Sequence, residues 1–366
     1  MKRNVLVIAG LAVLSTSAHA TKARMEALGQ NSVRGSEYIS DTRNVFRNPA
    51  VLNSTKNYLV TEWGSQTVAD DSTAAPRAEG GFFREMGSFN YGLYLGNDET
   101  AQGRTQAAGT YMRQDNALDL FLGGDMGVQW GARLHYANAK DQQTSAFEKK
   151  NTAFGLGLGV VIGEMEAYTN ITLADKSTGA VVAGDEFKTK PSYIVGGSYK
   201  MGSNSLYANY EATKVNVTGN AGGATLGETK TSTIVAGWGR VHEINPTARL
   251  LTDASLHIGS GQTTAGKTKE NALPVTLGFE ADATSWLVLR GAVQQNVIIN
   301  DEKNAAGKKI TSANSTDVNA GATLNFGKLK VDGSIGTTTS AGVANTENGV
   351  LSTSNLLTRV GVNYWF

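Results

Sequence analysis

An alternation of apolar and polar residues at the C-terminal end of the chain constrains its fold more than any other feature. Apolar or hydroxyl side chains occupy every second position from Leu356 to Phe366, and Arg359, Gly361 and Asn363 lie between them. Successive side chains of a β-strand point to opposite faces, so this pattern predicts a strand with one apolar and one polar face. Such a strand is typical of a membrane barrel, with lipid outside and water inside.

Other segments of the chain show the same alternation. The clearest are 128–136, 164–173, 249–258 and 275–281. A soluble sandwich also alternates, with its apolar face toward a protein core, so this pattern alone does not separate the two folds.

The connections between the expected strands favour the membrane barrel. Short turns recur at a spacing of about 40 residues, and long polar stretches lie between them, as in outer-membrane barrels. The short turns are expected at 86–87, 126–127, 163, 202–203, 243–246, 283–284 and 327–328, and the long loops at 64–78, 98–116, 139–149, 175–186, 218–228, 260–270, 300–314 and 339–354. These loops predict an all-β, antiparallel transmembrane barrel of about 16 strands, with periplasmic turns and extracellular loops.

Composition excludes a helical membrane protein. After the first 20 residues no apolar run approaches the length of about 20 residues that a spanning helix needs. A closed sheet gives every backbone N–H and C=O a partner inside a bilayer and leaves no free edge. Aromatic residues near expected strand ends predict interfacial girdles; they are Trp130, Tyr136, Phe279, Trp286, Tyr364 and Phe366.

The two ends of the chain indicate export to the bacterial outer membrane. Residues 1–20 are expected to be a signal peptide, with Lys2 and Arg3 at the start, an apolar stretch at 5–14, and cleavage after Ala20. Residues 21–56 form a compact N-terminal segment, periplasmic or lumenal, and 57–366 form the barrel. The final residues, with Tyr364 and Phe366 on one face, resemble the end signal of outer-membrane barrels, which implies recognition by the assembly machinery.

Motifs for catalysis, metal binding and cofactors are not found in the sequence. There is no cysteine, and His135, His242 and His257 lack the spacing of metal ligands. A hydrolase would need an assembly such as His135 with Asp119 or His257 with Asp253, and no spacing favours it. The 33 basic and 32 acidic residues nearly balance, which gives no indication of a nucleic-acid partner. We therefore expect no enzyme, metal or cofactor.

Charged residues on the polar faces of the strands are candidates for the lining of a pore. An Arg or Lys facing lipid at mid-membrane would cost about 2–4 kcal/mol, so these residues are expected to point inward. Inward charges of both signs can set a transverse field across a pore. The candidates are Arg133, Glu164, Glu166, Lys200, Arg249, Asp253, Glu280, Arg290 and Arg359.

The N-terminal segment carries a family resemblance. Residues 24–29 read RMEALG, and they are followed by motif residues that include Tyr38, Asp41, Arg43, Asn48 and Pro49. With the barrel behind it, this segment resembles the porin-like major outer-membrane proteins of predatory bacteria and their relatives. The resemblance implies a homo-oligomer larger than a trimer, with a central space that holds lipid. Small residues are expected at its subunit interface; Gly155, Gly157 and Gly159 are the candidates.

Other functions compete with the porin hypothesis. Residues 46–50, with Asn-Pro-Ala, are similar to the N-terminal hatch of hydrophobic-compound transporters of the fatty-acid type, which implies a plugged barrel and sideways release. A structural or adhesive barrel with a closed lumen is a third class. The sequence favours a porin for passive diffusion of small solutes, and these two classes stay as alternatives.

Overall fold

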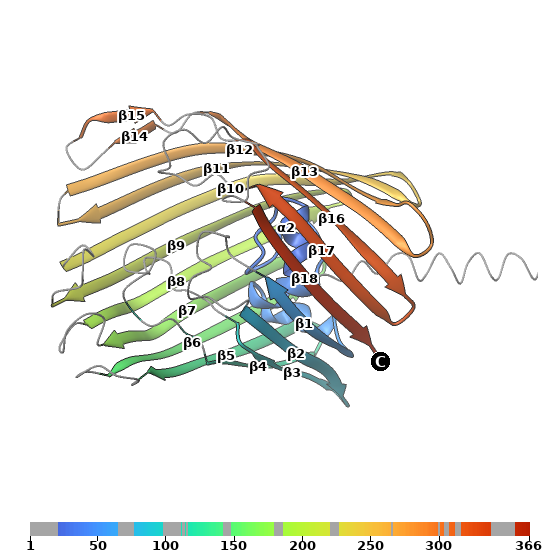
Figure 1. The fold of residues 1–366 in the computed structure, drawn as a ribbon, viewed down its shortest axis with the longest axis horizontal. Helices are drawn as coiled ribbons and strands as arrows, with labels where there is room; N and C mark the ends of the chain where they lie inside the picture. Colours follow the sequence, from blue (N-terminus) through green and yellow to red (C-terminus); the bar gives the residue numbers. More distant parts are fainter. Residues whose placement is uncertain are drawn as a thin grey trace, which may run out of the picture.

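A closed antiparallel barrel makes up almost all of the protein (Figure 1). The computed structural model describes residues 21–64, 77–97, 111, 114, 116–141, 148–178, 186–219, 227–264, 266–298, 301–303, 307–311, 316–337 and 356–366. The expected signal peptide, 1–20, and parts of the expected long loops lie outside the described residues. The 18 strands of the sheet comprise 16 strands of the barrel wall and a short hairpin of two strands.

Neighbouring wall strands are consecutive in sequence and antiparallel. The wall strands are β1 (Tyr58–Gly64), β2 (Arg77–Met86), β3 (Phe89–Leu95), β4 (Ala117–Asp125), β5 (Gln129–Asp141), β6 (Lys149–Ile162), β7 (Met165–Thr178), β8 (Glu186–Met201), β9 (Asn204–Thr218), β10 (Gly227–Asn245), β11 (Ala248–Thr263), β12 (Gly266–Asp282), β13 (Leu287–Ile298), β16 (Thr316–Phe326), β17 (Leu329–Thr337) and β18 (Leu356–Trp365). The hairpin of β14 (Asp301–Lys303) and β15 (Lys309–Thr311) lies in the connection between β13 and β16.

The first and last strands close the barrel. β1 pairs with β18 from Tyr58 opposite Trp365 to Gly64 opposite Arg359. The backbone N–H of the C-terminal Phe366 also donates to the carbonyl oxygen of Asn57 at 3.1 Å. The prediction of an antiparallel barrel of about 16 strands is confirmed.

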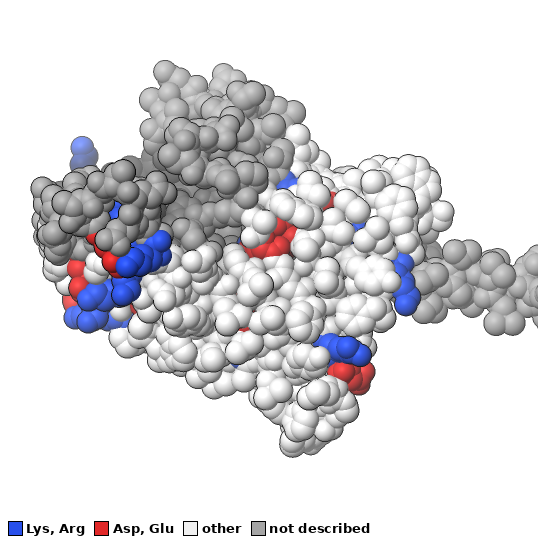
Figure 2. Space-filling view, turned by 60° about the horizontal axis from the view of Figure 1, so that its bottom comes forward, with Lys and Arg blue, Asp and Glu red and all other residues white. Residues whose placement is uncertain are grey.

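Side chains of the wall follow the predicted alternation. On β5, Arg133 is 2% exposed and His135 is buried, whereas Leu134 is 37% exposed. On β18, Asn363 is buried and Val360 is exposed. Figure 2 shows the outcome on one face: most of the surface is uncharged, and most charged side chains lie near its two ends, apart from an acidic group near the middle. No helix among the described residues is long and apolar enough to cross a membrane.

The predicted short turns are confirmed, but one predicted long loop is wrong. Gly87, Gly127, Gly163 and Gly202 turn the chain with positive φ, a conformation that glycine adopts without strain. The stretch 260–270 is instead the end of a hairpin, because β11 continues to Thr263 and β12 starts at Gly266. Its polar residues continue the strand pairing, so polarity alone did not mark a loop there.

The N-terminal segment, residues 21–56, lies inside the barrel, and we call it the plug. It contains α2 (Lys22–Ala27) and two 3-10 helices, η1 (Thr42–Phe46) and η2 (Pro49–Asn53). Each begins at a side chain that accepts a backbone N–H bond: Thr21, Asp41 and Asn48. α2 contacts β13 and β16–β18, whereas η2 contacts β3–β6 on another part of the wall. A buried segment that contacts such separate parts of a closed wall must occupy the lumen (Figure 1).

Candidate functional site: the plug in the lumen

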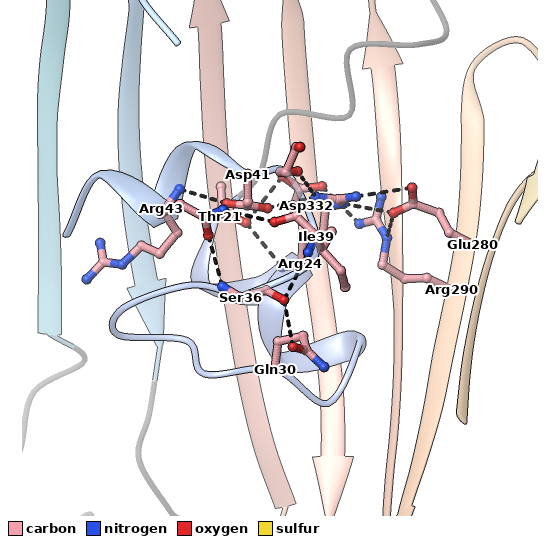
Figure 3. A network of polar contacts seen from close by, with 12 residues as sticks. Thr21, Arg24, Gln30, Ser36, Ile39, Asp41, Arg43, Glu280, Arg290 and Asp332 are labelled. Atoms are coloured by element: carbon pink, nitrogen blue, oxygen red, sulfur yellow. Dashed lines mark hydrogen bonds and ion pairs between the residues drawn. The ribbon is translucent and has the colours of Figure 1, made fainter. Parts of the chain in front are cut away.

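A buried cluster of ion pairs joins the plug to β12, β13 and β17 (Figure 3). Arg24 of α2 contacts Asp41 of the plug at 2.7 Å and Glu280 of β12 at 2.8 Å. Arg290 of β13 contacts the same Glu280 at 3.0 Å and Asp332 of β17 at 3.1 Å. One carboxylate of the wall is therefore shared between a cation of the plug and a cation of the barrel.

Burial makes the charges of this cluster depend on one another. Burial by itself lowers the pKa of Arg24, but Glu280 and Asp41 more than offset this effect, so the pKa of Arg24 is raised. Burial raises the pKa of Asp41 to about 6, although the neighbouring Arg24 opposes that shift. Removing one partner of such a buried pair leaves an uncompensated charge, which costs about 3–5 kcal/mol in comparable cases.

A second cluster joins the plug to β1 and β2. Glu62 and Glu79 face each other directly across these two strands, an arrangement of like charges that destabilises a bare sheet. Arg43 of η1 places its Nη1 3.2 Å from Glu62 and 2.9 Å from Glu79, and Lys22 contacts Glu79 at 2.5 Å. The hydroxyl of Tyr94 lies within hydrogen-bond distance of both carboxylates. The acidic pair on the wall is thus neutralised by cations of the plug.

A third cluster anchors the end of η1 to β7. Arg47 pairs with Glu37 of the plug and, at 3.0 Å, with Glu166 of β7. Asn48 donates to the same Glu166 at 3.2 Å, and Tyr168 of β7 donates to Glu37. The plug is therefore held on three separate parts of the wall.

Inward-facing glycines make room for the Asn-Pro-Ala segment of the plug. A Cβ at Gly159 would overlap the side chain of Asn48, and a Cβ at Gly131 would overlap the backbone of Pro49. A Cβ at Gly157 would also lie within 3.3 Å of Pro49. The expectation that Gly155, Gly157 and Gly159 face a neighbouring subunit is wrong, because their strand positions face the lumen.

The apolar side of the plug rests on an aromatic cluster. The ring of Phe46 meets those of Tyr94 and Phe121 edge to face, with centroids 4.9 and 5.4 Å apart. The guanidinium of Arg43 lies 3.9 Å from the centroid of Phe46, and that of Arg133 lies 5.1 Å from it. Phe46 therefore combines apolar burial with two cation–π contacts.

The structure places eight of the nine predicted pore-lining residues on inner faces of the strands and Glu164 in the exposed turn before β7, and several of them contact the plug. Arg249 and Arg290 share Glu280, Arg359 pairs with Glu26 at 3.0 Å, and Glu166 pairs with Arg47. Arg133 pairs with Asp119 at 2.7 Å besides its contact with the ring of Phe46. Asp253 accepts from Tyr207 at 2.6 Å, and Glu164 and Lys200 line a cavity of about 200 Å³. Their role in ion selectivity stays a prediction.

The histidines considered for catalysis have polar partners on the wall. His135 lies 2.8 Å from Asp119 through Nδ1 and 2.9 Å from Gln114 through Nε2, so both ring nitrogens are bonded. His257 is bonded to Ser255 rather than to Asp253. Among the described residues no group of three or more side chains is arranged to hold a metal ion.

Sequence reasoning missed the acidic partners of the plug. Glu62, Glu79 and Asp332 lie on inner faces of the wall, as strand alternation could have indicated. The available signal was the basic character of the plug, where Arg24 and Arg43 require acidic partners once they are buried.

Two further cavities flank the plug. One, of about 210 Å³, lies between Arg34 of the plug and β5–β9, and its lining includes His135, Phe154 and Tyr193. The other, of about 640 Å³, lies between the plug and β8–β11 and is lined by polar residues that include Lys200 and Arg249.

Comparison with known proteins finds structural neighbours only. No family model and no curated protein matches the chain. Among solved structures it is similar to the monoaromatic hydrocarbon channel CymD, at 12% identity and a TM-score of 0.46 over 93% of this chain and 96% of that one. A Pseudomonas aeruginosa FadL homologue matches at 11% and 0.44 over 95% and 98%, and a mutant of the Rh. blastica porin at 15% and 0.35 over 84% and 99%.

Proposed function

We propose that this protein is an outer-membrane channel whose lumen is closed at rest by its own N-terminal plug. We propose further that it takes up small hydrophobic compounds, in the manner of a transporter with an N-terminal hatch. The observation that carries this proposal is the buried set of ion pairs between the plug and separate parts of the wall, with Arg24 on Glu280 and Arg43 on Glu62 and Glu79. A lumen filled in this way offers no open aqueous path through the plug.

The outer surface supports the placement in a membrane. Exposed leucine, isoleucine, valine and aromatic side chains alternate with inward polar residues along the strands. In water such a surface would be an unusually large apolar patch, whereas in lipid it is solvated. The closed pairing of β1 with β18 leaves no strand edge in the hydrocarbon.

Irregular strand pairing supports a sideways exit for an apolar solute. The register shifts between Phe154 and Gly155 on β6 and between Lys190 and Tyr193 on β8. Both shifts lie beside the cavity of about 210 Å³, whose lining includes Phe154 and Gly155 of β6 and Tyr193 of β8. Bulges of this kind disrupt the ladder locally and bend a strand. A solute held above the plug would leave for the lipid at this point of the wall.

The diffusion porin is the second candidate function. The cavity of about 640 Å³ beside the plug favours it, because Lys200, Ser205 and Arg249 give that space a polar lining. In this alternative, water and small solutes pass beside the plug, and the lumenal charges select among them.

Conductance in planar bilayers separates the two candidates. The plugged transporter predicts near silence for the full mature chain and large, steady channels once residues 22–55 are deleted. The diffusion porin predicts steady channels from the full chain. Saturable uptake of a monoaromatic hydrocarbon by cells that carry the full chain, absent from cells without it, would support the transporter. Steady conductance of the full chain without such uptake would contradict it.

The assembly state and processing are proposals with simple tests. A homo-oligomer larger than a trimer that encloses lipid is supported by the resemblance of the N-terminal segment alone, and a monomeric band on an unheated gel would contradict it. Cleavage after Ala20 predicts Thr21 as the first residue of the mature protein, which N-terminal sequencing would read directly. Tyr364 and Phe366 are exposed at the end of the last strand, where an assembly factor could reach them.

A further inference from the structure

A band of lysines covers the outer face of β5–β12 near the long-loop end of the barrel. We call these residues the lysine face: Lys140, Lys150, Lys176, Lys188, Lys190, Lys214, Lys230, Lys267 and Lys269. Strand alternation places them outward, since the adjacent inward positions, such as Thr189 and Val215, are buried. Charged side chains gather at this end of the barrel in Figure 2.

The strand register aligns these lysines into a row across neighbouring strands. Lys190 of β8 lies directly opposite Lys214 of β9, which lies opposite Lys230 of β10. The row continues through Gln262 of β11 to Lys267 of β12. Like charges directly opposite each other destabilise a sheet, so this alignment calls for anions from outside the barrel.

The acidic residues that the structure describes compensate this band only in part. Glu228 serves three lysines of the row, at 3.0 Å from Lys190, 2.8 Å from Lys214 and 3.0 Å from Lys230. Two further opposed pairs join Lys140 with Lys150 and Lys176 with Lys188. In each of these, one lysine has a glutamate partner, Glu148 for Lys140 and Glu186 for Lys176. No carboxylate of the described residues pairs with Lys150 or Lys188.

The lysine face lies directly above the part of the wall that suits lipid. Tyr193 follows Lys190 on the outer face of β8 on the side of the membrane, and Tyr210 is the second outward residue of β9 beyond Lys214. Their rings lie 5.9 Å apart. Below them the outward positions are apolar or small, for example Val195 and Leu206. The order from apolar residues through aromatic rings to ammonium groups matches the order from acyl chains to headgroups in a bilayer leaflet.

We propose that the lysine face binds the phosphate groups of anionic lipid headgroups in the leaflet at the long-loop end. This inference rests on the proposed placement of the barrel in a membrane and does not depend on what the channel transports. Ammonium groups near an anionic surface attract it additively, and their flexible stems adapt to headgroups of different shape. Because the lysines of this band that the structure describes lie on β5–β12, such lipid would gather on one side of the barrel.

The test is lipid retention by the full mature protein in a neutral detergent, read by native mass spectrometry. The probes are diphosphoryl lipid A and the same lipid without phosphates, offered together at equal concentration. We expect at least about tenfold preference for the phosphorylated lipid, weakened by salt. Equal retention of both lipids would overturn the proposal, and so would displacement of the lipid by millimolar inorganic phosphate, which would indicate a simple anion site.

Matched variants test whether the preference for the phosphorylated lipid depends on the lysine face. A variant with Gln in place of Lys188, Lys190, Lys214, Lys230 and Lys267 should lose the preference, and Arg at the same positions should retain it. As a control, Gln in place of Lys56 and Lys328, near the short-turn end, should leave it unchanged. Equal loss in the control, or no loss in the first variant, would contradict the assignment.

The readouts also separate this inference from the proposed function. Heat-modifiable migration on a gel checks that each variant forms a barrel. A barrel that needs detergent but shows no phosphate preference removes this inference alone. A chain that is freely soluble without detergent removes the membrane placement and the inference with it.

Discussion

Arg24 of the plug and Glu280 of β12 form a 2.8 Å ion pair between two buried side chains that are 256 residues apart in the sequence. The same carboxylate also contacts Arg249 and Arg290 of the wall. Because the wall supplies two cations of its own, Glu280 stays compensated when Arg24 leaves. Arg24 instead loses its wall partner. The free-energy cost of releasing the plug therefore comes mainly from the unpaired charge of Arg24 rather than from Glu280.

Substitution of Arg24 should release the plug. In Arg24→Met the partner Asp41 loses its cation while it stays buried, so plug docking should weaken by about 3–5 kcal/mol. Proteolysis of the plug in folded protein should become faster, and open-channel events should become frequent. Arg34→Met is the matched control, because its pair with Glu211 is longer, at 3.4 Å, and partly exposed, and should contribute no more than about 1 kcal/mol. Equal effects of the two substitutions would contradict the role given to Arg24.

Truncation of Phe46 should loosen the plug without altering its charge. Phe46→Ala removes a buried ring and the two guanidinium contacts on it, which should cost about 3–5 kcal/mol. Phe46→Leu keeps most of the apolar burial and should cost less. Hydrogen exchange of the η1 amides measures both, and full protection of η1 in Phe46→Ala would be inconsistent with this packing.

A methyl group at Gly159 should block docking of the Asn-Pro-Ala segment. The added Cβ would overlap the side chain of Asn48, so Gly159→Ala should open the channel while the barrel still forms. The control is Gly259→Ala, another lumenal position, where a Cβ would meet only ordinary contacts at 3.5 Å and beyond. Single-channel recording compares the two. If Gly159→Ala showed no channel openings, contact between Gly159 and the Asn-Pro-Ala segment would not be needed to close the channel.

Asp41 should make plug stability depend on pH. Burial raises its pKa from 3.8 to about 6, so its contribution is fully present below the unfolded pKa and is lost as pH rises through about 6. Proteolysis of the plug should therefore be slower at about pH 5 than at about pH 7.5. Asp41→Asn, which keeps an oxygen to cap η1, should reduce this difference. An unchanged pH profile in Asp41→Asn would assign the dependence to another group.

The barrel was predictable because the polarity of a wall residue commonly indicates whether its side chain faces lipid or the lumen. Val360 and Asn363 differ in polarity because one faces outward and the other faces the lumen, and Leu134 and Arg133 differ for the same reason. The outward lysines near the long-loop end and the inward Phe121 depart from this rule. Strand closure follows from the same pattern, since an apolar outer face leaves no place for free strand edges.

The site was less predictable because it depends on pairs of residues distant in sequence. Nothing near Arg24 indicates that its partner is Glu280, and charge alone allows many pairings. The error at Gly159 was avoidable, since Leu156 and Leu158 alternate with the glycines and occupy the outward positions. Small residues suit either face of a strand. Only the alternation of the neighbouring residues between outward and inward positions indicates which face a small residue occupies.

The connection between plug and wall constrains how the molecule can be built. Asn57 alone separates the plug from β1, and the strand that seals the ring, β18, holds Glu26 of the plug through Arg359. If the barrel closed while it was empty, the N-terminal segment would be left outside one end of the barrel, joined to β1 through Asn57 alone. We therefore expect the N-terminal segment to be in place before β18 pairs with β1, so that closing the barrel and seating the plug are one event.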